Sequence, residues 1–146
     1  DLAWRKRNSL FSLETPYEVL ILASIIEKES GIMADQQKIS GVFKRRLEMR
    51  MRLQSDPTVI YGLGSHYGGN LSRNHLREDN PYNTYTRHGL PPTPISNPSW
   101  NSLVAAVQPQ QGQELYFVSR GDGTSEFSST LSEHNAAVRS YQLTPK

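Results

Sequence analysis

Val19-Leu-Ile-Leu-Ala-Ser-Ile-Ile26 is an almost uninterrupted apolar run, and Glu27-Lys28-Glu29 follows it directly. Just before the run, Thr15-Pro16-Tyr17-Glu18 has the form of a capping box, with Thr15 as the N-cap and a proline in the first turn. Gly31 is the predicted stop. These features predict a helix that is apolar on all sides and therefore lies inside the domain.

A carboxylate at the end of a buried helix is the first candidate for chemistry. Burial disfavours the charged form, so it raises the pKa of a carboxyl group toward the range that a general acid needs. Glu27 falls on the same helix face as Leu20 and Ala23, whereas Glu29 points nearly the opposite way. The spacing therefore selects Glu27 as the catalytic candidate and argues against a facing pair with Glu29.

The neighbours of Glu27 at helical spacing are all small: Ala23, Ser24, Ser30 and Gly31. Small neighbours predict a hollow above the carboxyl group that is large enough for a ligand. The spacing also leaves an alternative open, in which Glu27 pairs with Lys28 or a nearby arginine on a solvated rim.

Length and composition favour a single domain over residues 1–146. The absence of cysteine excludes a disulfide framework, a thiolate nucleophile and cysteine metal ligands. No apolar run approaches the roughly 18 residues that are needed to cross a bilayer. The chain begins at Asp1 without an initiator Met, which favours a piece of a longer protein.

Caps and periodicity predict further helices. Asp35 is expected to cap a second helix with an apolar stripe of Ile39, Val42, Phe43 and Leu47. Asp56-Pro57 is expected to cap and open a short helix before Gly62, and Asn97-Pro98 a later one. Shorter signals predict one more helix over residues 72–76 and a terminal helix over residues 131–141.

Residues 115–118 and 126–128 flank Gly121-Asp-Gly123, which offers Asp-Gly for the turn, so they predict a β-hairpin. Several helices around a buried one, with a small antiparallel sheet in the C-terminal half, give the α+β class. The long segment from Gly62 to Pro98 is mostly loop, and a loop of this length in a compact domain is unusual unless it lines a site.

The side chains in and before that loop suit a sugar polymer. Tyrosine rings offer flat faces for pyranose rings, and amide, hydroxyl and carboxylate groups offer hydrogen bonds. Binding modules have similar loops, and each tyrosine can also simply cover the core. The candidate substrate-binding residues are Gln54, Asp56, Tyr61, Tyr82, Asn83, Thr84 and Tyr85.

Other chemistries lack support. The four histidines show no metal-ligand spacing, and no nucleotide-binding or serine-hydrolase motif is present, so neither a metal nor a cofactor is expected. The net charge is +2, and the basic clusters at residues 5–7 and 44–46 read as solvated helix faces, so nucleic acid is not expected as a partner. Glu27 and Asp56 could form a two-carboxylate glycosidase site, but capping is the simpler role for Asp56.

Three blocks of sequence carry a family resemblance: Ala23-Ser-Ile-Ile-Glu-Lys-Glu29, then Val42-Phe43 with Arg46-Leu47, then Met51-Arg-Leu-Gln-Ser-Asp-Pro-Thr-Val-Ile-Tyr-Gly62. Further blocks continue in order at residues 82–85, 89–92, 94–95, 97–98, 115–118, 121–123 and 134–135. Together they resemble the YceG-like (MltG) family of endolytic murein transglycosylases from about Trp4 to Tyr141.

The resemblance implies an enzyme that cleaves the β-1,4 bond between N-acetylmuramic acid and N-acetylglucosamine and leaves a 1,6-anhydro-muramoyl end. It implies a single catalytic Glu in the first block, which would be Glu27. It also implies a periplasmic site of action in cell wall synthesis, with glycan strands and wall-synthesis proteins as partners. The family usually has a membrane anchor and a LysM-like subdomain before the catalytic domain, so the resemblance implies that residues 1–146 are a catalytic fragment that includes neither of them.

The implied mechanism needs one acid. Glu27 would protonate the leaving oxygen and then accept the proton of the muramoyl C6 hydroxyl as that oxygen attacks C1. Many relatives have a His after Gly-Asp-Gly-Thr, where this chain has Ser125. A non-catalytic glycan-binding module and a hydrolase that uses Asp56 or Glu29 as a second carboxylate remain the alternatives.

Overall fold

The computed structural model describes residues 2–5, 7 and 13–141. In chain order the elements are α1 (Leu2–Arg5), α2 (Pro16–Glu29), α3 (Met33–Glu48), α4 (Asp56–Leu63), a 3₁₀ turn η1 (Gly64–His66), α5 (Arg73–Arg77), α6 (Trp100–Val107), β1 (Tyr116–Ser119), β2 (Ser125–Ser128) and α7 (Leu131–Tyr141). The predicted α+β class is confirmed. Lys6, in the first basic cluster, lies outside the described residues.

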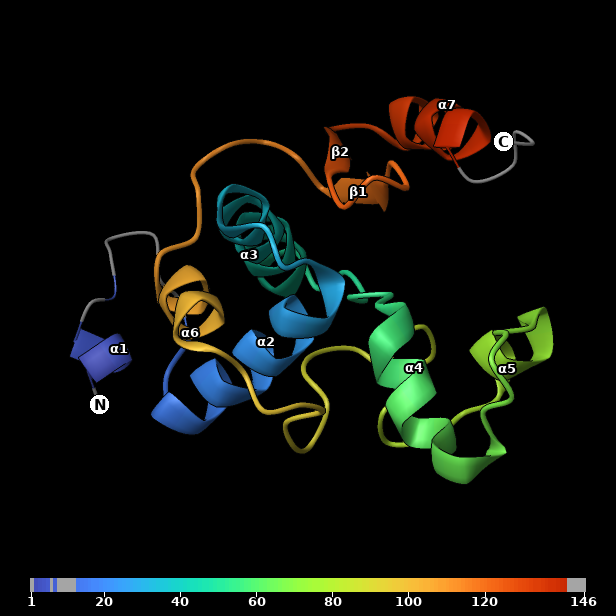
Figure 1. The fold of residues 1–146 in the computed structure, drawn as a ribbon, viewed down its shortest axis with the longest axis horizontal. Coiled ribbons are helices and arrows are strands. Elements are labelled where there is room, and N and C mark those ends of the chain that lie inside the picture. The colour runs from blue at the N-terminus through green and yellow to red at the C-terminus, as the bar shows by residue number, and fades with distance from the viewer. Residues whose placement is uncertain (1, 6, 8–12, 142–146) are drawn as a thin grey trace.

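Helix α2 runs through the middle of the molecule and packs against α3, α4 and α6 (Figure 1). The predicted capping box is present: the Glu18 N–H donates to the Thr15 hydroxyl, and the Glu18 carboxylate accepts from the Thr15 N–H. Every residue from Ile21 to Ile26 is buried, so the prediction of a core helix is confirmed. The helix ends at Glu29, its C-cap Ser30 has an extended backbone, and Gly31 has no left-handed φ angle, so Gly31 is not the predicted glycine stop.

Helix α3 contributes the expected stripe to the core, with Ile39, Val42 and Phe43 almost fully buried. The expected cap is wrong, because the N-cap is Ile32 and no side chain caps the helix. Asp35 lies in the first turn, and its carboxylate instead accepts a hydrogen bond of 2.9 Å from the Ser125 N–H. The residue predicted as a local cap therefore ties α3 to the distant β2.

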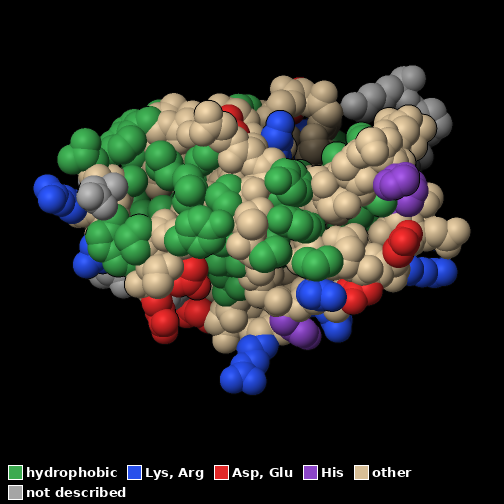
Figure 2. Space-filling view, turned by 90° about the horizontal axis from the view of Figure 1, so that it is seen from below, with side chains coloured by type: hydrophobic (Ala, Val, Ile, Leu, Met, Phe, Trp, Pro, Cys, Tyr) green, Lys and Arg blue, Asp and Glu red, His purple; other side chains and the backbone are tan. Residues whose placement is uncertain are grey.

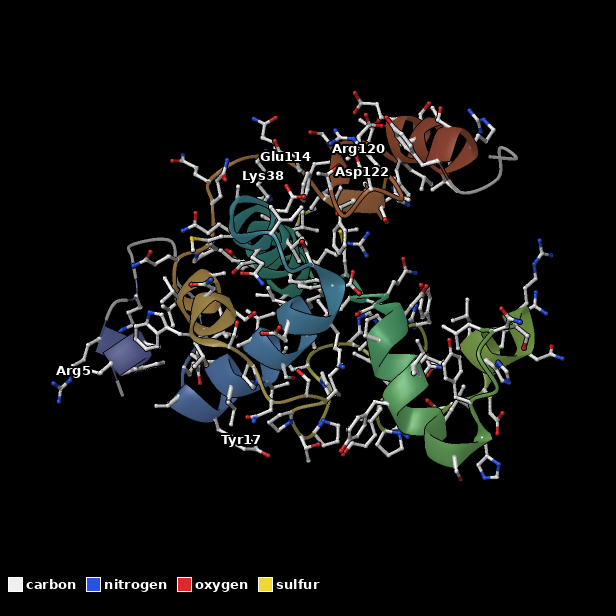
Figure 3. The ribbon with its side chains drawn as sticks, viewed as in Figure 1. Arg5, Tyr17, Lys38, Glu114, Arg120 and Asp122 are labelled. Carbon is white, nitrogen blue, oxygen red and sulfur yellow. The ribbon has the colours of Figure 1, made fainter. Side chains whose placement is uncertain are left out.

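The basic cluster on α3 is not the solvated face that the sequence predicts. Arg46 is buried, and Arg45 is partly buried. Arg45 donates to the backbone oxygens of Gln110 and Glu114, and Arg46 donates to that of Leu115. These bonds hold the segment between α6 and β1, which contains Glu114, against α3, and Figure 3 shows Glu114 close to Lys38 of that helix.

The shorter helices follow the prediction in part. Helix α5 lies where a short helix is predicted and has Ser72 as its N-cap, and Ser99 caps α6, which begins at Trp100 rather than at Asn97-Pro98. Helix α4 begins at Asp56 as predicted, but Ser55 is its N-cap and makes no side-chain capping bond. The capping role predicted for Asp56 is therefore wrong, and its carboxylate is available for another partner.

The C-terminal residues form a unit of β1, β2 and α7 that packs on α3. The strands pair antiparallel with Phe117 opposite Phe127, which confirms the predicted hairpin, and α7 has the predicted bounds. The Phe117 ring meets the Phe43 ring edge-on at 5.7 Å. Figure 1 shows this unit on one side of the C-terminal end of α2 and helix α4 on the other.

Apolar side chains cover much of the lower face of the molecule (Figure 2). Tyr17 projects at this edge from the start of α2 (Figure 3). Within the described part of the chain, no helix is long and apolar enough to cross a membrane.

Candidate functional site

A pocket of about 360 Å³ opens between the two halves of the chain. One wall comes from the end of α2 and the start of α4, together with the loop that holds Tyr85, and the other from the hairpin and α7. The first wall consists of Glu29, Leu53, Gln54, Asp56 and Tyr85, and the second of Phe117, Val118, Ser119, Ser125, His134 and Val138, with Arg46 from α3.

Glu29 lines this pocket, and the pKa of its carboxyl group is strongly raised. Burial raises its pKa to about 7, and the negative charge of Asp56 adds to the rise, while a hydrogen bond from Ser55 opposes it. The Ser55 hydroxyl donates to Glu29 Oε1 at 3.1 Å, which holds the carboxyl group in one orientation. A carboxyl group with a pKa near 7 can donate and accept protons at neutral pH.

Glu27 does not line this pocket. Its Oε1 atom accepts from the Ser99 N–H at 2.7 Å and from the Ser102 hydroxyl at 2.9 Å, at the start of α6. These bonds, chiefly that from the Ser99 N–H, lower the pKa of Glu27, so the expected rise is contradicted. That Glu27 is the catalytic residue stays a prediction, although its carboxylate is bonded to groups at the start of α6.

The expected hollow above Glu27 is filled by the chain that leads into α6. The Ile95 N–H donates to the Ser24 hydroxyl at 2.9 Å, and the Ser96 hydroxyl donates to the Ser24 backbone oxygen at 2.8 Å. The small side chains on this face of α2 thus admit a neighbouring segment of the protein rather than a ligand.

Three predicted binding residues meet in the pocket: Gln54, Asp56 and Tyr85. The Tyr85 hydroxyl donates to Asp56 Oδ1 at 2.5 Å. Burial and this hydrogen bond raise the pKa of Tyr85, so the phenol keeps its proton and Asp56 keeps a donor. The hydrogen bond holds the Asp56 carboxylate in place close to Glu29.

The other four predicted binding residues do not line the pocket. Asn83 is fully buried; its amide nitrogen donates to the backbone oxygens of Leu76 and Glu78, and its amide oxygen accepts from the N–H groups of Tyr85 and Thr86. The Thr84 hydroxyl accepts from the Ser55 N–H at 2.9 Å. The two residues therefore support the pocket from behind.

Tyr61 and Tyr82 contact each other, with ring centroids 4.9 Å apart. Tyr61 is 45% exposed, and the Tyr82 hydroxyl is within 2.7 Å of the Thr93 hydroxyl. The pair forms an aromatic surface outside the pocket, so a role for it in substrate binding remains a prediction.

Sequence reasoning gave no site role to Arg46, Ser125 or His134, and it gave Glu29 only a place in an alternative. Three of them, Glu29, Arg46 and His134, stand in the blocks that carry the family resemblance, and Ser125 stands where many relatives have a His. Among the described residues, no group of three or more His, Asp and Glu side chains is placed to hold a metal ion.

Gln54 lies in the left-handed region, with a φ angle of 52°, although it is not a glycine. Such a backbone costs about 1 kcal/mol for a residue with a Cβ atom and persists where the surroundings enforce it. We expect Gln54→Gly to raise the free energy of unfolding by about 0.5–1 kcal/mol. Urea titrations of the parent and the variant test this, and a variant that is less stable than the parent would contradict it.

The comparisons with known proteins agree with one another. Residues 3–140 match the YceG-like family. The chain is 43% identical over 125 residues to the endolytic murein transglycosylase of Bacillus subtilis, covering 86% of this chain and 34% of that protein. It is 37% identical over 112 residues to the enzyme of the same name from Streptococcus pneumoniae, covering 71% and 20%.

A crystal structure of a YceG-like protein from Listeria monocytogenes superposes with a TM-score of 0.75 at 44% identity, covering 82% of this chain and 38% of that one. The chain thus spans about a third or less of the curated relatives that it matches. Sequence and structure lead to the same conclusion: this chain belongs to the YceG-like family.

Proposed function

We propose that this chain is the catalytic part of a lytic transglycosylase that cleaves peptidoglycan glycan strands, with Glu29 as its acid and base. The observation that carries the proposal is a carboxyl group with a pKa of about 7 in an open pocket, beside the polar side chains of Gln54, Asp56 and Tyr85. The names of the Bacillus and Streptococcus relatives support the choice of substrate.

In the proposed reaction, protonated Glu29 donates its proton to the oxygen between the two sugars as the bond to the muramoyl C1 atom breaks. The resulting carboxylate accepts the proton of the muramoyl C6 hydroxyl while the C6 oxygen attacks C1. The bond to the leaving sugar is replaced by an internal 1,6-anhydro bond, and no water is consumed. One carboxyl group serves both steps because its pKa lies near neutral pH.

Asp56 and Gln54 have supporting roles in this proposal. The Asp56 carboxylate, held by the Tyr85 hydroxyl, stabilises the positive charge that develops at C1 as the bond breaks. Gln54 offers an amide that can bind the N-acetyl group of the sugar. Glycan strands lie outside the cytoplasmic membrane, so we place the action of the whole protein there, during synthesis or remodelling of the wall.

A hydrolase is the second candidate, because Glu29 and Asp56 line the same pocket. Most glycosidases use two carboxyl groups in catalysis. The masses of the products separate the two reactions. A transglycosylase leaves anhydro-muramoyl ends, which are lighter by one water than the reducing ends of a hydrolase. Detection of reducing ends alone would replace the proposed reaction with hydrolysis.

The pKa of Glu29 leads to a pH prediction. The reaction begins from the protonated acid, and this form is lost as the pH rises through about 7. We expect kcat/KM to fall about tenfold for each pH unit well above that value. Initial rates of strand cleavage between pH 5 and 9 test this, and a rate that still rises at pH 8.5 would be inconsistent with Glu29 as the acid.

A further inference from the structure

Arg46 is a buried cation on the wall of the pocket. Its side chain reaches from α3, and the residue is only 6% exposed. Its Nε donates to the Leu115 backbone oxygen at 2.6 Å, and its Nη1 donates to that of Arg52 at 2.7 Å. The guanidinium group also lies over the Tyr116 ring, 4.9 Å from the centroid.

These contacts orient the guanidinium group but do not neutralise it. Among the described residues, no carboxylate lies within 4.0 Å of Arg46, and no acceptor is bonded to its Nη2 group. A buried arginine normally pairs with an anion, because an uncompensated charge in a protein interior is costly. Arg45, one residue earlier on α3, does have such a partner in Glu114.

The surroundings of Arg46 do not carry a second positive charge. His134 stacks on the Tyr116 ring at 5.0 Å and also lines the pocket. Burial and the nearby Arg46 lower the pKa of His134, so the imidazole is neutral at neutral pH. Its Nδ1 atom is buried without a hydrogen-bond partner among the described residues. The guanidinium group is therefore the sole fixed cation among the pocket-lining residues.

We propose that the Arg46 end of the pocket binds a carboxylate group of the substrate. The inference rests on the proposed function, and it narrows the substrate to glycan strands that carry carboxylates near the scissile bond. Two sources have this chemistry: the free lactyl carboxylate of a muramoyl residue without a peptide, and an acidic residue of an attached peptide.

The acidic groups of the pocket are compatible with this binding. Glu29 is largely protonated below pH 7, and Asp56 is bonded to the Tyr85 hydroxyl. Both contribute to the first wall, whereas Arg46 comes from α3 and lies against Tyr116 of the hairpin, so the acidic and basic groups of the pocket belong to different elements. A substrate carboxylate bound at Arg46 would fix the orientation of the glycan strand in the pocket. It would thereby determine which sugar lies next to Glu29.

The test compares three sets of glycan strands of equal length on the unmodified protein: free lactyl carboxylates, their methyl esters, and peptide-substituted strands. Binding is measured by calorimetry in low salt and cleavage by chromatography. We expect the methyl esters to bind about tenfold more weakly than at least one carboxylate form. The tighter of the two carboxylate strands identifies the source. Equal binding of the esters and both carboxylate forms would overturn the inference.

Two variants locate the effect. Arg46→Gln should lose the preference for carboxylates over esters, while Arg45→Gln, a change on the same helix with similar backbone partners, should keep it. If Arg46→Gln keeps the preference, the assignment to Arg46 is wrong.

NMR titration of His134 in the unmodified protein gives a readout that needs no variant. A carboxylate bound at Arg46 should raise the pKa of His134 by about 0.5 or more, and the ester should not. An equal pKa with both ligands would also overturn the inference. Carboxylate preference without any cleavage would reject the proposed function alone.

Discussion

Glu29→Gln is expected to lower the rate of glycan strand cleavage by about 10³-fold, because a positioned acid and base contributes 10²–10⁴-fold to such reactions. The amide keeps the size of the side chain and can still accept from the Ser55 hydroxyl. Binding of strands should therefore change little, and the loss should appear in kcat rather than KM. Steady-state kinetics on purified strands measure both.

The same variant should be more stable than the parent at high pH, which separates lost chemistry from misfolding. The folded-state pKa of Glu29 is raised from 4.5 to about 7. The folded state thus holds this proton more tightly, and the parent loses stability as the pH rises from about 4.5 to 7. Above pH 7 we expect Glu29→Gln to be more stable by about 1–2 kcal/mol. A variant that is less stable than the parent at pH 8 would contradict the raised pKa.

Glu27→Ala is expected to lower the free energy of unfolding by about 2 kcal/mol, because it removes the charged acceptor of the Ser99 N–H and the Ser102 hydroxyl. Those bonds join the end of α2 to the start of α6. The Ser102 hydroxyl in turn accepts from Gln36 on α3 at 3.1 Å, so three helices meet at this carboxylate. Activity per folded molecule should remain within a few-fold of the parent.

The effect of Glu27→Ala should depend on pH in the opposite sense to that of Glu29→Gln. The folded-state pKa of Glu27 lies below its ordinary value of 4.5. Its stabilising contribution is fully present above about pH 4.5 and is lost as the pH falls through the folded-state pKa. Urea unfolding at pH 7 and pH 3.5 measures the difference. Loss of all turnover by a fully folded Glu27→Ala protein would instead favour Glu27 as the acid.

Local features of the sequence predicted the elements well. The Thr15 cap, the apolar run and the turn at residues 121–123 are short-range signals, and the structure has α2 and the hairpin where these signals indicate. Helical spacing also placed Glu27 and Glu29 on different faces. The spacing could not tell which face would meet a pocket and which would meet a neighbouring helix.

The choice between the two acids depends on contacts that are far apart in the chain. Residues 95–99 cover the face of Glu27, and residues 53–56 with the hairpin leave an opening above Glu29. Asn83 shows the same limit: an amide next to tyrosines suits a sugar, yet its burial among backbone groups makes it a support of the loop. The polar residue types in the sequence indicated which side chains could serve in a site. Long-range packing decided which of them line the pocket and which support the fold.

Mass spectrometry of the products from purified glycan strands tests the central claim most directly, with the parent, Glu29→Gln and Glu27→Gln compared at pH 6. We predict 1,6-anhydro-muramoyl ends from the parent and from Glu27→Gln, and none above background from Glu29→Gln. Anhydro ends from Glu29→Gln at the rate of the parent, with none from Glu27→Gln, would contradict the account and return the catalytic role to Glu27.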